Sequence, residues 1–297
     1  MYNDFKKSGI IHKIIQTKIK ENYHNFKTAL DITIFIEENI KTLTKYDKNN
    51  PLQAGIAFPV GISINDVAAH FTPSLNNNPS LNNDDIIKID FGVHINGCIT
   101  DGAFSWCPSG KYNSLIDIST GATNLAIKNS GPDAILGDIG EIIQEYIESK
   151  EIIIDNKIYK IKSIYDLCGH NIAPYIIHVN KAVPNIKINY KERMLEGEIF
   201  AIETFPTTGD GLIYESQECN HYMIESRNVK NFYNNKYLSK IFQDRSTLAF
   251  CPRWFNFEIP DSNYITKYPV LKTKDKSVVA QYEKTIYIKD NGITIFN

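Results

Sequence analysis

Apolar side chains in the first fifty residues recur at helical spacing. Residues 3–22 and 31–47 predict two helices, and Asp31 stands where the second helix would take its N-cap. The second helix carries an apolar stripe at intervals of three and four residues: Ile32, Phe35, Ile36, Ile40 and Leu43. Such a stripe needs an apolar surface to cover it, so we expect both helices to pack against a sheet.

Beyond residue 54 the spacing changes to short runs of β-type residues. These runs extend from Gly55 to Trp106. Helical spacing returns at 114–129 and 138–149, and the second of these helices opens with Asp138 and Glu141, which have the spacing of a capping box. The first half of the chain therefore predicts helices packed beside strands.

The second half of the chain reads mostly as strands. They are expected at 158–167, 198–206, 221–224, 277–289 and 292–296. A helix near 234–243 falls within 226–268, a segment that we interpret as an insert. Helices followed by strands, twice over, predict an α+β fold of two similar halves, which we take as a single domain spanning 1–297.

Composition excludes several classes of protein. The 32 basic and 34 acidic side chains leave a net charge of -2 without a basic cluster, which argues against nucleic acid and anionic membranes as partners. The N-terminus has no apolar stretch suited to a secretory signal and no apolar run is long enough to span a membrane, so we expect a cytoplasmic protein. The five cysteines show no CxxC spacing and predict neither a disulfide framework nor a thiolate metal site.

Two aspartates lie in the segment IIKIDFGVHINGCITDGAFSW, which predicts a hairpin. Its Asn96-Gly97 pair is typical of a two-residue type I′ turn, and that turn fixes the register. Gly92 then lies opposite Asp101, and Asp90 lies opposite Ala103, so the two carboxylates are diagonal neighbours on one face, roughly 7 Å apart at their Cβ atoms.

Carboxylates that close repel each other unless a cation lies between them. Gly92, opposite Asp101, is expected to leave open volume in which an ion and its water fit. The alternative is a solvated face with no ion, and the hairpin alone does not decide between the two.

Further acids and histidines occur in similar settings. Glu203 shares a strand face with apolar residues, and Glu283 lies in the middle of a β-rich run, where an unpaired buried carboxylate would cost several kcal/mol. Exposure at the surface is the alternative for each acid alone, and a structural role is the alternative for each of His70, His170 and His178. Together, two Asp, two Glu and one His form an oxygen-rich ligand set that suits Mn, Fe, Co or Zn, and four carboxylates require two ions.

At this point the chain resembles a known family, the methionine aminopeptidases of type 2 in the creatinase and prolidase superfamily. The resemblance covers nearly the whole chain in seven ordered blocks: AGIAFPVGISINDVAAHFTP, KIDFGVHINGCITDGAF, CGHNIAPYIIHVNKAVP, MLEGEIFAIETF, ECNHYM, STLAFCPRW and AQYEKTI. It implies a pita-bread fold, with two pseudo-symmetric halves around a curved antiparallel sheet and a type-2 insert. It also implies removal of the initiator methionine from nascent chains.

The resemblance implies a role for each metal ligand. Asp90 would chelate one divalent ion, Asp101 and Glu283 would bridge both, and His170 and Glu203 would hold the other. The ions would activate a water to hydroxide, and Glu203 would carry its proton toward the leaving amine.

The remaining residues implied by the resemblance contact the substrate. His70 would stand near the scissile peptide and matches the histidine that fumagillin-type epoxides alkylate in this family. His178 would contact the substrate carbonyl, and both histidines would stabilise the oxyanion. The methionine pocket would be lined by Phe58, Ile177, His221, Tyr268 and Leu271.

Two features separate the chain from close alternatives, and three others depart from the type-2 pattern. The 226–268 segment is absent from type-1 enzymes, and only about fifty residues precede the first block, whereas prolidases carry a separate N-terminal domain there. No Lys-rich extension of the eukaryotic kind is present, so any ribosome contact would be transient. Cys168 stands where the family commonly has Asn, and the stretch between Trp254 and Tyr264 is shorter than usual. A non-catalytic homologue that binds RNA or ribosomes and an Xaa-Pro dipeptidase are the alternative functions.

Overall fold

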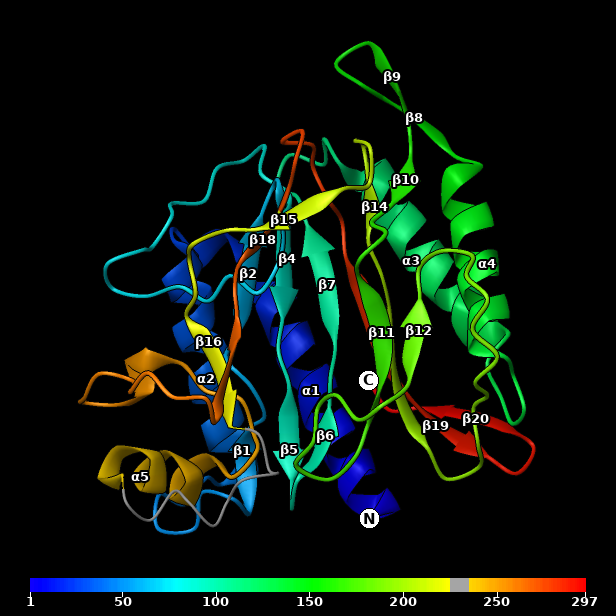
Figure 1. The fold of residues 1–297 in the computed structure, drawn as a ribbon. Coiled ribbons are helices and arrows are strands. Elements are labelled where there is room, and N and C mark those ends of the chain that lie inside the picture. The colour runs from blue at the N-terminus through cyan, green and yellow to red at the C-terminus, as the bar shows by residue number, and fades with distance from the viewer. Residues whose placement is uncertain (225–234) are drawn as a thin grey trace.

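A curled antiparallel sheet organises the computed structural model, which describes residues 1–224 and 235–297 (Figure 1). Within these residues the sheet has eight strands, in the order β12-β11-β13-β19-β7-β4-β2 with β20 paired to β19. Their bounds are β2 (Gly61–Ile64), β4 (Ile87–Asp90), β7 (Ala103–Trp106), β11 (Cys168–Ile172), β12 (Ala182–Pro184), β13 (Ile199–Thr204), β19 (Tyr282–Lys289) and β20 (Gly292–Ile295). Strands of the first and second halves meet where β7 pairs with β19.

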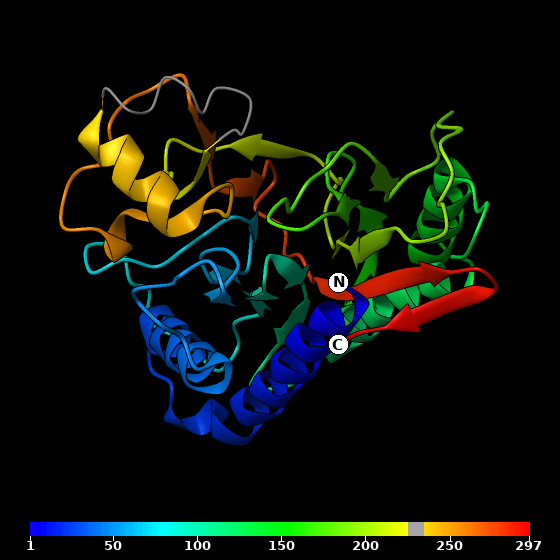
Figure 2. The same ribbon diagram turned by 90° about the horizontal axis from the view of Figure 1, so that it is seen from below.

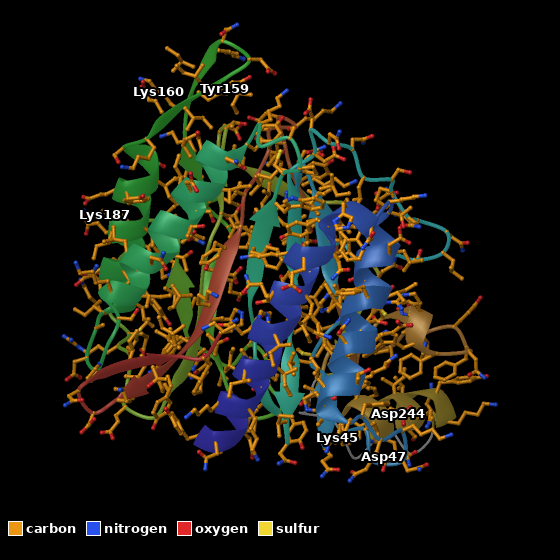
Figure 3. The ribbon with its side chains drawn as sticks, turned by 180° about the vertical axis from the view of Figure 1, so that it is seen from behind. Lys45, Asp47, Tyr159, Lys160, Lys187 and Asp244 are labelled. Carbon is orange, nitrogen blue, oxygen red and sulfur yellow. The ribbon has the colours of Figure 1, made fainter. Side chains whose placement is uncertain are left out.

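Two pairs of helices cover one face of this sheet. They are α1 (Tyr2–Asn22) with α2 (Ala29–Thr44), and α3 (Asn113–Lys128) with α4 (Leu136–Glu148). Seen from behind, all four lie in front of the strands (Figure 3), and the view from below shows the two pairs as separate groups (Figure 2). This arrangement confirms the pita-bread fold expected from the resemblance.

Alternation along the strands divides the sheet into a helix-facing side and a second side. Ile87 and Ile89 of β4 pack with the apolar stripe of α2, and Phe200 and Ile202 of β13 pack in the cluster that contains α3 and α4. The residues between them, Asp90 among them, face away from the helices. Acidic side chains on β4, β13 and β19 therefore share the second side.

The helices lie within two or three residues of the predicted positions, but their caps differ. Thr28, and not Asp31, is the N-cap of α2, and Asp31 completes a capping box from the third helical position. The predicted capping box at Asp138 and Glu141 is wrong, because Ile135 occupies the N-cap of α4 without a side-chain hydrogen bond. The start of α4 is therefore not set by a side-chain cap.

Most other strands are short and form small ladders at the edges. They are β1 (Ala54–Ile56), β3 (Val67–Ala69), β5 (Val93–Ile95), β6 (Cys98–Thr100), β8 (Glu151–Ile154), β9 (Lys157–Lys160), β10 (Lys162–Ser163), β14 (Pro206–Thr207), β15 (Ile213–Glu215), β16 (His221–Ile224), β17 (Ile265–Tyr268) and β18 (Leu271–Thr273). The predicted strand at 158–167 is divided between β9 and β10, and the one at 277–289 begins only at Tyr282. No described helix combines the length and apolar character needed to cross a membrane.

The predicted insert folds around its own small core. β16, which ends just before the predicted insert, pairs with β17 at the end of the insert. Between these strands lie α5 (Lys236–Arg245) and a 3-10 turn, Pro252–Trp254. The core residues are Ile224, Leu238, Ile241, Phe250 and Ile265. Residues 226–234 of the predicted insert lie outside the described residues, and we propose 226–268 as a subdomain of one catalytic domain.

His12 of α1 gives the fold a measurable pH dependence. Its ring stacks on Phe91, lies within hydrogen-bond distance of the Phe91 and Gly102 carbonyls, and is only 1% exposed. Burial, with a contribution from Lys284, lowers the pKa of His12 from 6.5 to about 3. Folded His12 therefore stays neutral between these values, whereas unfolded His12 takes up a proton, so stability is lost as the pH falls below 6.5.

Replacing His12 with Gln is expected to flatten this dependence. Between pH 6.5 and 4 the wild type should lose about 3 kcal/mol more of its free energy of unfolding than His12→Gln, at ~1.4 kcal/mol per pH unit. Urea unfolding with a chelator present measures the difference. The exposed His24 supplies the control His24→Gln, and equal pH slopes for wild type and His12→Gln would contradict the prediction.

Candidate metal centre and active site

Sheet register brings three of the predicted ligands together. Glu203 of β13 is paired directly with Glu283 of β19, and His170 of β11 is paired with Ala201, two residues from Glu203 on the same face. His170 is in the middle of β11. These three side chains therefore project from adjacent strands toward one point.

The hairpin has the predicted register. Ile95 pairs with Cys98 and Asp90 with Ala103, and the turn residues Asn96 and Gly97 both have positive φ, 49° and 77°. The hairpin pairing continues from β5 and β6 into β4 and β7, which belong to a second sheet. Asp90 at the end of β4 and Asp101 just after β6 therefore lie on the same face.

Asp101 is held beside Glu283 by a buried threonine. The Asp101 N–H donates to Thr285 Oγ1 at 2.8 Å, and the same hydroxyl donates to the Asp101 carbonyl at 2.7 Å. Thr285 lies two residues after Glu283 and on the same face of β19. The bridge therefore fixes the backbone of Asp101 against the strand that carries Glu283.

The resulting cluster is compact and buried. One ligand atom from each of Asp101, His170 and Glu283 lies within 4.8 Å of the others. His170 Nε2 is 3.6 Å from Asp101 Oδ2 and 3.8 Å from Glu203 Oε1. The exposed fractions are 4% for Asp101, 8% for His170, 9% for Glu203 and 2% for Glu283. Asp90 joins the group through Gln281, whose Nε2 donates to Asp90 Oδ2 at 3.3 Å and to Glu203 Oε2 at 3.4 Å.

The buried carboxylates of the cluster repel one another, and bound cations would relieve this repulsion. Burial raises the pKa of Asp90 to about 7, and burial together with the neighbouring carboxylates raises the pKa values of Asp101, Glu203 and Glu283 well above the ordinary range. Asp90 Oδ1 and Asp101 Oδ1 are buried and have no hydrogen-bond donor among the described residues. Burial also lowers the pKa of His170, which leaves the neutral imidazole that binds metals. This donor set fits divalent cations with oxygen and imidazole ligands.

Gly92 has a different role from the predicted one. A Cβ at this position would lie 2.3 Å from Cε1 of Phe58 and 2.9 Å from Cβ of Ala57. The space beside Asp101 is therefore filled by the Phe58 ring and is not open to an ion. The absence of a side chain at Gly92 lets the predicted pocket residue Phe58 pack against the hairpin.

A cavity of about 390 Å³ opens over the cluster. Four of the five predicted pocket residues line it: Phe58, Ile177, His221 and Tyr268. The fifth, Leu271, does not line it; it is paired with Ala69 and Glu215 in a small sheet and packs against a separate core cluster. Cys168, two residues before the ligand histidine, also lines the cavity.

Four histidines and a tyrosine line the cavity. The His170 and His178 rings are 4.2 Å apart, and His70 lies 6.0 Å from His221 and 5.6 Å from Tyr268 between ring centroids. Both His70 and His178 line the cavity, as predicted. Gln281 and Ala249 are among the lining residues that the sequence did not predict. Gln281 stands two positions before Glu283 in a β-rich run and hence on the same strand face.

His70 is held in one tautomer. Its Nδ1 lies 3.2 Å from the Pro269 carbonyl, which can only accept, so Nδ1 carries the proton and Nε2 keeps its lone pair. The backbone of His70 is left-handed, with φ of 67°. Burial lowers the pKa of His70, so the ring is neutral at pH 7.

The curled antiparallel sheet and the buried acidic cluster with its histidine define a metal-dependent hydrolase of the pita-bread class. Residues 3–290 match metallopeptidase family M24. Methionine aminopeptidase 2 of Yarrowia lipolytica is 38% identical over 97% of this chain, and that of Dictyostelium discoideum is 39% identical over 97%. The chain therefore belongs to metallopeptidase family M24, and within it to the methionine aminopeptidases of type 2.

The relatives are longer than this chain. It spans 64% of the Yarrowia protein and 69% of the Dictyostelium protein, about two thirds of the curated relatives. Solved structures share the fold. Methionine aminopeptidase from Thermotoga maritima has a TM-score of 0.69 and 19% identity, and the match covers 99% of this chain and 95% of that one. A thermophilic Arx1 has a TM-score of 0.77 and 16% identity, and the match covers 99% of this chain and 90% of that one.

Proposed function

We propose that this protein removes the N-terminal methionine from nascent polypeptides in the cytoplasm. The observation that carries the proposal is the convergence of Asp90, Asp101, His170, Glu203 and Glu283 under one cavity whose upper walls are largely apolar. A purely binding role is opposed by the retention of all five donors, since a buried carboxylate cluster without a cation costs free energy. Contact with ribosomes would be transient.

The assignment of residues to the two metal ions is the one that the family resemblance implies. Asp90 would bind one divalent ion, Asp101 and Glu283 would bind both, and His170 and Glu203 would bind the other; Co, Mn, Fe and Zn all suit this set. When bound, the two ions supply Lewis-acid activation of a water and of the scissile carbonyl. Gln281 holds the side chains of Asp90 and Glu203 through its Nε2, and Thr285 holds the backbone of Asp101.

Proton transfer would use Glu203. Its carboxyl group lines the cavity, so it would take a proton from the attacking water and return it to the leaving amine, as the resemblance implies. His178, 4.2 Å from His170 between ring centroids, is placed to donate to the substrate carbonyl. His70 has an unprotonated Nε2, so we propose that it accepts a hydrogen bond from the N–H of the scissile peptide, a role that differs from the oxyanion stabilisation that the resemblance implies.

Selectivity for methionine would come from the side-chain pocket. Phe58, Ile177 and Ala249 provide apolar contact for an unbranched thioether, and His221 and Tyr268 close the remaining sides. Sulfur packs favourably against aromatic ring edges, which these walls offer.

A peptide assay tests the proposed function. Metal-stripped protein is expected to regain release of methionine from Met-Gly-Met-Met when Mn or Co is added, and to cleave Xaa-Pro dipeptides at least about tenfold less well. Preferential cleavage of Xaa-Pro substrates would assign a dipeptidase. RNA binding at physiological salt without turnover under any metal would assign the non-catalytic alternative.

A further inference from the structure

Arg245 is a buried cation in the insert that takes no part in the proposed chemistry. It is the last residue of α5 and is 8% exposed, and its Cζ lies 4.8 Å from the Trp254 ring centroid. Among the described residues, no carboxylate lies within ion-pair distance of its guanidinium. Its two nearby acids are engaged elsewhere, since Glu37 pairs with Arg253 and Asp244 pairs with Lys240.

Backbone carbonyls take the place of a carboxylate. Nη2 donates to the carbonyls of Ile56 at 2.8 Å, Ala57 at 3.0 Å and Ala249 at 2.8 Å, and Nε donates to Ala249 at 3.2 Å. Burial lowers the pKa of Arg245 to about 10, so the group remains charged at neutral pH. One planar cation therefore links three carbonyls from two chain segments that are distant in sequence.

Both segments lead into the substrate cavity. Ile56 and Ala57 immediately precede Phe58, and Ala249 lines the cavity itself. Phe58 is restrained on its other side by Gly92 and by the hydrogen bond from the Ala57 N–H to the Gly92 carbonyl at 2.9 Å. The guanidinium joins the carbonyls of Ile56 and Ala57 to that of Ala249, so it links the two segments of this wall.

The arrangement also connects the cavity wall to the helix layer. The end of α5 lies beside the end of α2, where Figure 3 labels Asp244 and Lys45 near each other, and Lys41, Tyr46 and Arg245 line one outer cavity of about 350 Å³. Arg253 and the Trp254 indole both donate to Glu37 of α2, which fixes the ring on which Arg245 stacks. The guanidinium therefore stacks on the fixed Trp254 ring and at the same time donates hydrogen bonds to the backbone of the pocket wall.

We propose that Arg245 is a positioning residue for substrate selection: it fixes the spacing of Phe58 and Ala249 and thereby restricts the pocket to an unbranched side chain without touching the substrate. The inference rests on the proposed function and assigns part of its specificity to the insert. Without the guanidinium, three buried carbonyls lose their donor, and the wall is free to widen for β-branched and γ-branched residues.

The test compares peptides that differ only in their first residue. For Arg245→Met, the ratio of kcat/KM for Met-Ala-Ser over Leu-Ala-Ser is expected to fall at least about tenfold, the range that one side-chain difference commands in an apolar pocket. The change should come mainly through a higher KM for the methionine peptide. Arg245→Lys, which keeps a charged donor, should retain part of the discrimination.

Leu238→Ala is the matched control. Leu238 lies on the same helix in the core of the insert and is 3% exposed, so its loss destabilises α5 without removing a carbonyl donor. This variant should lower the melting temperature and keep the Met-to-Leu ratio. An unchanged ratio in folded Arg245→Met, or an equal loss of ratio in Leu238→Ala, would overturn the proposal, whereas absence of methionine release by the wild type would refute the proposed function itself.

Discussion

Asp101→Asn is expected to abolish metal-dependent methionine release, with a fall in kcat/KM of at least about 10³-fold, or ~4 kcal/mol. Asparagine has nearly the same shape, so the Thr285 bridge to the backbone survives, but the negative charge that would hold both ions is lost. Assays of the metal-stripped protein over a titration of Mn measure both the turnover and the metal affinity, and both should decline.

Stability of the metal-free protein should move in the opposite direction. A buried carboxylate with a raised pKa opposes folding once the pH exceeds its unfolded pKa, so removing the Asp101 charge should stabilise the metal-free fold at pH 8 and have little effect at pH 4. The exposed Asp117 of α3 supplies the control Asp117→Asn, which should change neither property. Turnover by Asp101→Asn at the wild-type rate would exclude the assigned metal centre.

The acidic hairpin shows what the sequence could predict about the site. Asn96-Gly97 fixes the turn type, the turn fixes the register, and the register places Asp90 and Asp101 on one face with no knowledge of the rest of the chain. The turn type depends only on the two turn residues, and the alternation of side chains along each strand then determines which residues share a face. The pairing of Glu203 with Glu283 is different, because eighty residues separate them and no local pattern predicts which distant strands pair.

Other features of the site depend on packing that no local pattern encodes. Gly92 was interpreted as space for an ion, yet Phe58 arrives from another segment and fills that space. Thr28 and Asp31 are both good capping residues, and the structure selects Thr28 because a bridge to Ser80 fixes the chain there. No sequence pattern predicts the role of Arg245. A lone arginine at a helix end is ordinarily solvated, and main-chain carbonyls, which are its hydrogen-bond acceptors here, leave no mark in the sequence.

His70 is expected to be the residue that fumagillin-type epoxides modify in this protein. The Pro269 carbonyl holds the proton on Nδ1, so the Nε2 lone pair faces the cavity; it attacks an epoxide carbon, the C–O bond breaks, and the released oxygen takes a proton from solvent. Intact-mass measurement should show the wild type gaining one inhibitor mass, and His70→Ala should gain none. Labelling should be lost completely in His70→Ala because the covalent bond forms at Nε2 of His70.

The pH dependence of labelling distinguishes a neutral nucleophile from simple proximity. Burial lowers the pKa of His70, so the unprotonated ring persists as the pH falls from 8 to 6.5, and the labelling rate should stay nearly constant over that range. An exposed histidine with an ordinary pKa would lose about half of its reactivity by pH 6.5. His24→Ala, on the outer surface, should label like the wild type, whereas labelling of His70→Ala at the wild-type rate would place the nucleophile elsewhere in the cavity.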